Sequence, residues 1–382
     1  MKKLNQEKLH ALIDARVQAD IDSGKVGGAA LCVLQDGKVL LNKTYGYQNA
    51  TTKEPLRKDA MYRLASMTKP ITAVAALIAQ DMGLLSIDDP LCKYIPAYEH
   101  MQIGHLENGQ PVYDKDAQTT ITLKHLLSHT SGLGTLEIGD YDWARMPAEL
   151  AKTPAGVMEW LSDKMLAFEP YTAQWYSPVA AFVAVARVIE IVSGMPYNAF
   201  LNQYLFEPLG MCDTTFALNE DQKARMIAMH NYTEEQGSFA VPKSTDTVFE
   251  NIPVTQYCGG AGLAATLDDY VKFAEMLTHG GEGNGVRILS EQAVAQMATV
   301  QVTDQIMPPP VQWGLGVRVI SADGYQMPKG CFGWSGAYGT HYWSDPENKI
   351  SAIYMKNSGY DGGAGALTAF LFEQDVYAAM EG

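Results

Sequence analysis

Segments with the pattern of β-strands lie at both ends of this chain. Near the N-terminus, two apolar runs, 28–35 and 38–41, flank Asp36-Gly37, which is the strongest short-range signal for a β-hairpin. The last third contains three more strand-like runs, at 313–320, 331–343 and 350–356. Residues 345–349 form a turn between the last two. Strands joined by tight turns favour antiparallel pairing, so we predict an α+β fold with an antiparallel sheet flanked by helices.

Between these ends the apolar residues recur mainly at helical spacing. Helices are predicted at 4–17, 66–82, 122–129, 154–166, 178–193, 196–206, 267–278, 290–298 and 367–380. Two long polar segments, 100–120 and 233–256, are predicted to be solvent-exposed excursions. A length of 382 residues suits two or three domains. We expect an α/β sheet domain built from residues 1–88 and 256–382, with an inserted, mainly helical domain at 89–255.

The charge of the chain narrows the range of partners. Acidic residues outnumber basic ones by 43 to 28, for a formal charge of −15, and such a field repels phosphate backbones and anionic lipid. We therefore expect no nucleic acid and no membrane surface as a partner. The five cysteines form no Cys-x-x-Cys pair, and the N-terminus lacks the apolar core of a signal peptide. A cytoplasmic protein with reduced cysteines is expected.

Ser66-Met67-Thr68-Lys69 stands at the start of the predicted helix 66–82. Residues three apart share one face of a helix, so the serine hydroxyl and the lysine amine can point into one cavity. The dipole and unpaired N–H groups at a helix N-terminus favour an oxyanion there. A lysine at its ordinary pKa of ~10.4 is a poor base at neutral pH, so a catalytic Ser–Lys pair requires a lowered pKa. The plain alternative is a helix-capping serine beside a surface lysine.

The residues around this pair, 62–72, resemble the nucleophile segment of the serine β-lactamase and penicillin-binding-protein superfamily. The resemblance is closest to class C β-lactamases and to their esterase relatives, the family VIII carboxylesterases. Further motifs of the superfamily follow in the same order at 84–90, 126–133, 175–177, 206–211, 259–263 and 334–340. The similarity extends over about residues 20–375. It implies a β-lactamase/transpeptidase-like fold and an acyl-serine mechanism.

The resemblance also implies roles for individual residues. Ser66 is the implied nucleophile, and Lys69 and Tyr176 share general-base and general-acid duty, with the first proton acceptor left open. The oxyanion hole combines the backbone N–H groups of Ser66 and Ala337. The implied substrate-binding positions are Pro178, Trp334, Ser335, Gly336 and Tyr338. No metal and no other cofactor is implied.

Two departures from the superfamily pattern bear on the substrate. Its β-lactamases and peptidases carry Tyr-x-Asn, whose Asn holds an amide side chain, whereas Pro178 has no side-chain donor. They also carry Lys- or His-Thr-Gly, whose cation helps to bind a carboxylate, whereas this chain has Trp334. A neutral ester needs neither group, which predicts a serine hydrolase that cleaves short-chain carboxylic esters. The alternatives are a β-lactamase, a D-amino-acid peptidase or amide hydrolase, and a non-catalytic penicillin-binding-like sensor.

The roles of three histidines and the conformation of the loop that carries Tyr176 are less clearly indicated by the sequence. His125 and His129 lie four apart on a predicted helix, which is a spacing for metal ligands. No His-Glu-x-x-His occurs, so both are predicted to be structural. His341 is placed on the 331–343 strand, where it either rims the site or faces away. Tyr171 stands where the family often has Gly, and Trp175 falls one residue later than usual, which leaves the conformation of the loop open.

Overall fold

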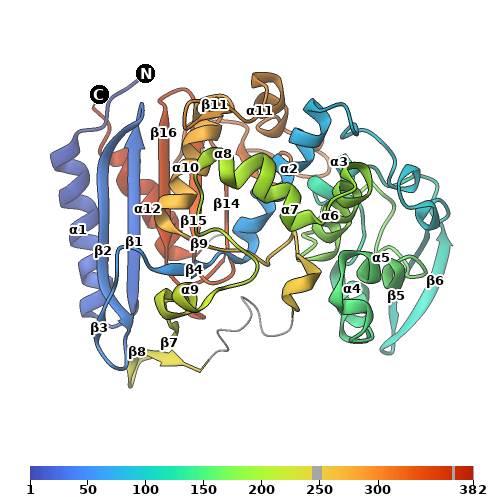
Figure 1. The fold of residues 1–382 in the computed structure, drawn as a ribbon, viewed down its shortest axis with the longest axis horizontal. Coiled ribbons are helices and arrows are strands. Elements are labelled where there is room, and N and C mark those ends of the chain that lie inside the picture. The colour runs from blue at the N-terminus through green and yellow to red at the C-terminus, as the bar shows by residue number, and fades with distance from the viewer. Residues whose placement is uncertain (243–251, 364–365, 382) are drawn as a thin grey trace.

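Strands from both ends of the chain meet in one sheet (Figure 1). The structure is a computed structural model that describes residues 1–242, 252–363 and 366–381. In the described residues, eight antiparallel strands run in the order β12-β13-β14-β15-β16-β1-β2-β3. Their bounds are β1 Gly28–Gln35, β2 Lys38–Asn49, β3 Glu54–Pro55, β12 Val311–Trp313, β13 Arg318–Ile320, β14 Phe332–Ser335, β15 His341–Asp345 and β16 Ile350–Met355. The predicted antiparallel α+β fold is confirmed, while the division into two domains stays a prediction.

The hairpin of β1 and β2 follows from its turn residues. Asp36 and Gly37 both have positive φ, 51° and 73°. Two consecutive positive φ values are typical of the two-residue turn that suits the twist of antiparallel strands. The predicted hairpin is therefore confirmed.

The two faces of the sheet are covered by different helices. On one face, Leu31 and Val33 pack in a cluster with α1 Gln6–Asp22 and α12 Leu367–Ala378. On the other, Cys32 and Leu34 join the main core with α10 Leu267–Thr278. This alternation is the period of two that a strand buried on both faces shows. The two termini lie together, because Asn5 N–H donates to the carbonyl of Ala379 (Figure 1).

The remaining helices lie mostly between residues 68 and 225, beside the sheet (Figure 1). They are α2 Thr68–Asp81, α3 Leu123–Leu127, α4 Leu136–Ala144, α5 Pro154–Leu161, α6 Ala180–Ser193, α7 Tyr197–Leu201, α8 Glu207–Leu209 and α9 Glu220–Arg225, with α11 Glu291–Met297 later in the chain. Every residue from Thr68 to Ala79 of α2 is buried. In the part of the chain that the structure describes, no single helix has the length and apolar character to cross a bilayer; α6 and the helical stretch Tyr197–Leu209 pass that test only as a pair bent by 78°.

Short two-stranded sheets complete the fold. They pair β4 Met61–Arg63 with β9 Ala264–Thr266, β5 Gln102–Glu107 with β6 Gln110–Asp116, β7 Met229–Thr233 with β8 Gly237–Val241, and β10 Glu282–Gly283 with β11 Val286–Arg287. The predicted excursion 100–120 is therefore largely a hairpin. The segment 233–256 contains β8, and its residues 243–251 lie outside the described residues.

Two predicted strands are each divided into two. The run 313–320 is divided after Trp313, where Gly316 takes a φ of 68°, and β13 returns antiparallel to β12. The run 331–343 is divided after Ser335, where Gly339 takes a φ of 89° and the chain reverses into β15. Glycine adopts these left-handed conformations at little cost, so the apolar runs conceal turns.

Candidate active site

Ser66 lies in a 3₁₀ turn, Ala65–Met67, that leads directly into α2. Ala65 has a φ of 48°, a left-handed conformation that is uncommon outside glycine and that clusters at functional sites. Lys69 follows one helical turn later and is completely buried. Its Nζ lies 3.2 Å from the Oγ of Ser66. The three-residue spacing therefore brings the two groups into contact.

The side chain of Lys69 has two further partners, and both are backbone carbonyls. Nζ donates to the carbonyl oxygen of Pro178 at 2.6 Å and to that of Gly260 at 2.8 Å. Carbonyl oxygens only accept, so these two contacts fix the directions of two N–H bonds on Nζ. The third tetrahedral position on Nζ then faces Ser66. In the ammonium form this position carries an N–H, and in the neutral amine it carries a lone pair that can take the serine proton. The N–H or lone pair of Lys69 that is not engaged by a carbonyl therefore points at Ser66.

Tyr176 comes from the loop between α5 and α6 and lies beside Lys69. The Nζ of Lys69 is 4.8 Å from the centroid of the tyrosine ring. The hydroxyl oxygen of Tyr176 accepts a hydrogen bond from the indole Nε1 of Trp334, on β14, at 3.3 Å. An indole N–H can only donate, so the phenol oxygen is the acceptor in this contact. The loop and the sheet thus meet at the Tyr176 hydroxyl.

Aromatic rings surround Tyr176. The centroid of its ring lies 4.5 Å from His129, 5.5 Å from Trp334 and 6.0 Å from Trp313. His129 and Trp313 also contact each other, at 4.4 Å. Sequence reasoning missed Trp313, whose one signal was its place at the start of a strand-like run. These rings restrict how far the phenol can move.

The turn after β14 packs against the residues that precede Ser66. A Cβ on Gly336 would lie 2.2 Å from the carbonyl oxygen of Leu64, so this approach requires glycine. The hydroxyl of Thr340 donates to the same carbonyl at 3.0 Å. Ala337 and Tyr338 lie in this turn, with Ala337 exposed and Tyr338 half-buried. The turn that carries Ala337 thus lies against the segment that leads to Ser66, while the oxyanion hole shared by their N–H groups stays a prediction.

The predicted substrate-binding side chains do not all lie on one side of β14. Trp334 is half-buried against Tyr176, and Pro178 is exposed next to Lys69. Ser335 is only 4% exposed, and its Oγ lies 2.7 Å from the Nδ1 of His341. Because consecutive strand residues point to opposite faces, the Ser335 hydroxyl faces away from the Trp334 indole. The predicted role of Ser335 in substrate binding stays a prediction, and its hydroxyl contacts His341.

Ser335 and His341 belong to a buried polar network behind β14. Glu373 of α12 forms a short ion pair with Arg318, and its Oε1 lies 3.0 Å from the Nε2 of His341. The contact between the His341 imidazole and this carboxylate is electrostatic. Burial lowers the pKa of His341. Burial opposes ionisation of Glu373, but His341 and Arg318 outweigh it and lower its pKa to about 2.

Glu373→Gln is expected to destabilise the protein by roughly 3 kcal/mol at pH 7, because Arg318 would stay buried without its counter-charge. The folded pKa of Glu373 lies below its ordinary value of 4.5. Its contribution is therefore present above that value and is lost as the pH falls toward about 2. Urea unfolding of both proteins at pH 7 and pH 3 measures this, and the difference should shrink at pH 3. An equal difference at both pH values would contradict an ionised Glu373.

The imidazoles of His125 and His129 both contact the protein backbone. Within residues 1–242, 252–363 and 366–381, no group of three or more His, Cys, Asp or Glu side chains is arranged to hold a metal ion. The Nδ1 of His125 accepts the backbone N–H of Thr122 and caps α3. The Nδ1 of His129 accepts the backbone N–H of Ser177 at 3.0 Å. Both imidazoles are thus engaged with the backbone.

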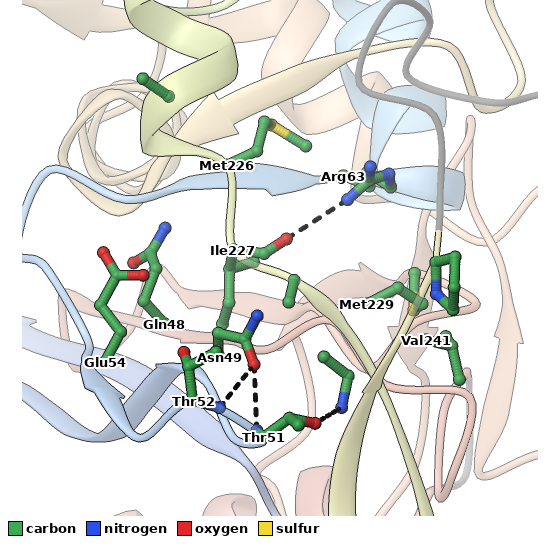
Figure 2. A pocket seen from close by; sticks show the side chains of 14 residues that line it. Gln48, Asn49, Thr51, Thr52, Glu54, Arg63, Met226, Ile227, Met229 and Val241 are labelled. Atoms are coloured by element: carbon green, nitrogen blue, oxygen red, sulfur yellow. Dashed lines mark hydrogen bonds between the residues drawn. The ribbon is translucent and has the colours of Figure 1, made fainter.

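A separate cavity of about 480 Å³ lies beside β4 (Figure 2). Arg63, three residues before Ser66, lines it and donates to the carbonyl of Ile227 (Figure 2). On its other side, Asn49 accepts the backbone N–H groups of Thr51 and Thr52. None of the predicted catalytic or substrate-binding side chains lines this cavity, so we do not assign it to the reaction.

Comparison with known proteins identifies the family of the chain. The family model described as Beta-lactamase matches residues 13–375. Esterase EstB of Burkholderia gladioli is 26% identical over 98% of this chain and 97% of its own, and a lovastatin esterase of Penicillium rubens is 31% identical over 69% and 67%. The solved structure of EstCE1, "a hydrolase with promiscuous acyltransferase activity", superposes with a TM-score of 0.78 at 23% identity, covering 97% of this chain and 99% of that one. The chain therefore belongs to the beta-lactamase family and has its fold.

Proposed function

We propose that this chain is a serine hydrolase that cleaves short-chain carboxylic esters through an acyl-Ser66 intermediate. The observation that carries the proposal is the position of Lys69. Two backbone carbonyls hold its Nζ so that its third position faces the Ser66 hydroxyl at 3.2 Å. The family includes esterases similar to this chain over most of its length, which supports ester chemistry.

In the acylation step, the Oγ of Ser66 attacks the ester carbonyl carbon while its proton passes to Lys69 or Tyr176. The developing oxyanion accepts from the backbone N–H groups of Ser66 and Ala337, each worth about 2.7–4 kcal/mol in related sites. The carbon–oxygen bond to the alcohol then breaks, and the alcohol leaves with a proton from the same Lys69–Tyr176 pair. Water, deprotonated by that pair, attacks the acyl carbon and releases the acid, and Ser66 recovers its proton.

Two contacts favour a neutral substrate. Trp334 stands where amide-cleaving relatives have a cation, and its N–H is already donated to Tyr176. Pro178 offers no side-chain donor, and its carbonyl is occupied by Lys69. Neither residue supplies a positive charge for a substrate carboxylate. The formal charge of −15 acts in the same direction, although salt screens it.

The test compares kcat/KM for p-nitrophenyl butyrate, nitrocefin and a D-alanyl p-nitroanilide. We expect the ester to be preferred by at least about 100-fold, because the recognition groups for the other two are replaced. Efficient turnover of nitrocefin or of the anilide would instead identify a β-lactamase or a peptidase. Labelling with a fluorophosphonate probe, followed by mass spectrometry, distinguishes an enzyme from a non-catalytic penicillin-binding-like sensor. An unlabelled Ser66 would favour the sensor.

A further inference from the structure

We propose that His129 is the positioning residue for Tyr176: as a neutral imidazole it anchors the backbone on both sides of the tyrosine and so fixes where the phenol lies. The inference rests on the proposed function, because it concerns the placement of a group in that reaction. Sequence reasoning treated His129 as structural, and its contacts assign it a more specific task.

Three contacts join His129 to Tyr176 and its neighbours. The carbonyl oxygen of His129 accepts the N–H of Trp175 at 3.0 Å. Its Nδ1 accepts the N–H of Ser177, also at 3.0 Å. Its ring lies 4.5 Å from the ring of Tyr176, centroid to centroid. One residue thus holds the backbone before and after Tyr176 and also touches the side chain between them.

The segment that carries His129 holds the loop at two more points. The hydroxyl of Thr135 donates to the carbonyl oxygen of Tyr176 at 3.0 Å, and the hydroxyl of Ser177 donates to the carbonyl of Leu133 at 3.0 Å. His129 itself has a φ of 57°, just after α3 ends. Such backbone persists in a non-glycine residue only where the surrounding structure stabilises it.

These contacts define the protonation state of the imidazole. Nδ1 accepts a backbone N–H and so carries no proton, which leaves the proton of the neutral ring on Nε2. That nitrogen is buried with no hydrogen-bond partner among the described residues. The ring centroids of Phe182 and Trp313 lie 5.3 and 4.4 Å from the centroid of the imidazole. Burial, and then the charge of Lys69, lower the pKa of His129 well below its ordinary value. A second proton would abolish the Ser177 contact and place a cation near Lys69.

A matched set of variants tests the proposal. His129→Phe keeps a ring but removes the acceptor for Ser177, whereas His129→Gln keeps an acceptor oxygen without a charge. We expect His129→Phe to lower kcat for p-nitrophenyl butyrate roughly 10- to 100-fold with KM changed less than about 3-fold, because a small misplacement of a catalytic group acts on the chemical step. His129→Gln should recover at least part of kcat. The control is His125→Gln, which alters an imidazole of α3, four residues earlier, that also accepts a backbone N–H and should leave kcat unchanged.

A spectroscopic measurement on the wild type is independent of turnover. The ¹⁵N spectrum should contain a histidine signal with Nδ1 unprotonated and Nε2 protonated from pH 5.5 to 8 that is missing in His129→Gln. His125, whose Nδ1 also accepts a backbone N–H, should give a similar signal, which is identified by its loss in His125→Gln. A His129 signal that titrates near pH 6.5, or wild-type kcat in His129→Phe, would overturn the proposal. If the wild type cleaves no ester, the proposed function fails. In that case the spectrum and the rate of fluorophosphonate labelling of Ser66 in each variant decide the role of His129.

Discussion

Ser66→Ala is expected to lose at least about 10⁴-fold in kcat for p-nitrophenyl butyrate. Alanine has no oxygen to form the acyl intermediate, so only binding and the backbone N–H groups would remain. The fold should be retained, because the contact of the Ser66 hydroxyl with Lys69 is one of three that hold that lysine. The release of p-nitrophenolate measures the loss, and fluorophosphonate labelling with mass spectrometry shows whether the probe still reacts.

The control for this variant is Ser162→Ala. Ser162 is also a half-buried serine, but its hydroxyl donates to the carbonyl of Glu159 at the end of α5. The Ser162→Ala variant is expected to hydrolyse p-nitrophenyl butyrate at the wild-type rate. Full turnover in Ser66→Ala, or labelling at another residue in the wild type, would disprove the assignment of the nucleophile.

Lys69→Met is expected to lower kcat by about 10³-fold or more, because it removes the group that faces the Ser66 proton. It should also cost roughly 1–3 kcal/mol of stability, since the partly buried carbonyl of Pro178 and the buried carbonyl of Gly260 lose their donor. Steady-state kinetics and urea unfolding measure the two effects separately.

Lys69→Arg separates charge from proton transfer. A guanidinium keeps the positive charge near Tyr176 but does not give up its proton in proteins. If Lys69 exchanges a proton with Ser66, the arginine variant should be nearly as inactive as the methionine variant. Near wild-type activity in Lys69→Arg would identify Tyr176 as the base. Lys69 would then act only through its positive charge.

The features predicted correctly from the sequence are mostly local. The β1–β2 hairpin depends on Asp36 and Gly37, whose positive φ values are a property of two adjacent residues. The contact between Ser66 and Lys69 depends on helical spacing over a single turn. Tyr176 lies beyond the reach of any local pattern, and the resemblance to a family was needed to place it next to Lys69.

The features that were missed depend on contacts between distant segments. The turn between β14 and β15 was not predicted, because its sequence looks like part of a continuous strand. Gly336 is needed there because a Cβ would collide with the carbonyl of Leu64, which is far away in the sequence. The face to which Ser335 points became clear only once His341 and Glu373 were placed behind it. Helix α4 was also missed: it contains Gly139, where a Cβ would lie 2.4 Å from the backbone of Gly134. A close backbone contact of this kind produces no periodic pattern of apolar residues in the sequence.

The pairing of β1 with β16 has a consequence for how the protein is made. On the ribosome, β1 and β2 emerge early and can close their hairpin, but the other edge of β1 pairs with β16, which ends at Met355. The turn that meets Leu64 also emerges late. A nascent chain therefore exposes an open strand edge until β16 has been synthesised, which is a hazard for aggregation. The site around Ser66 is completed only after the turn at 336–340 has been synthesised, so products truncated before this turn should be both inactive and prone to associate.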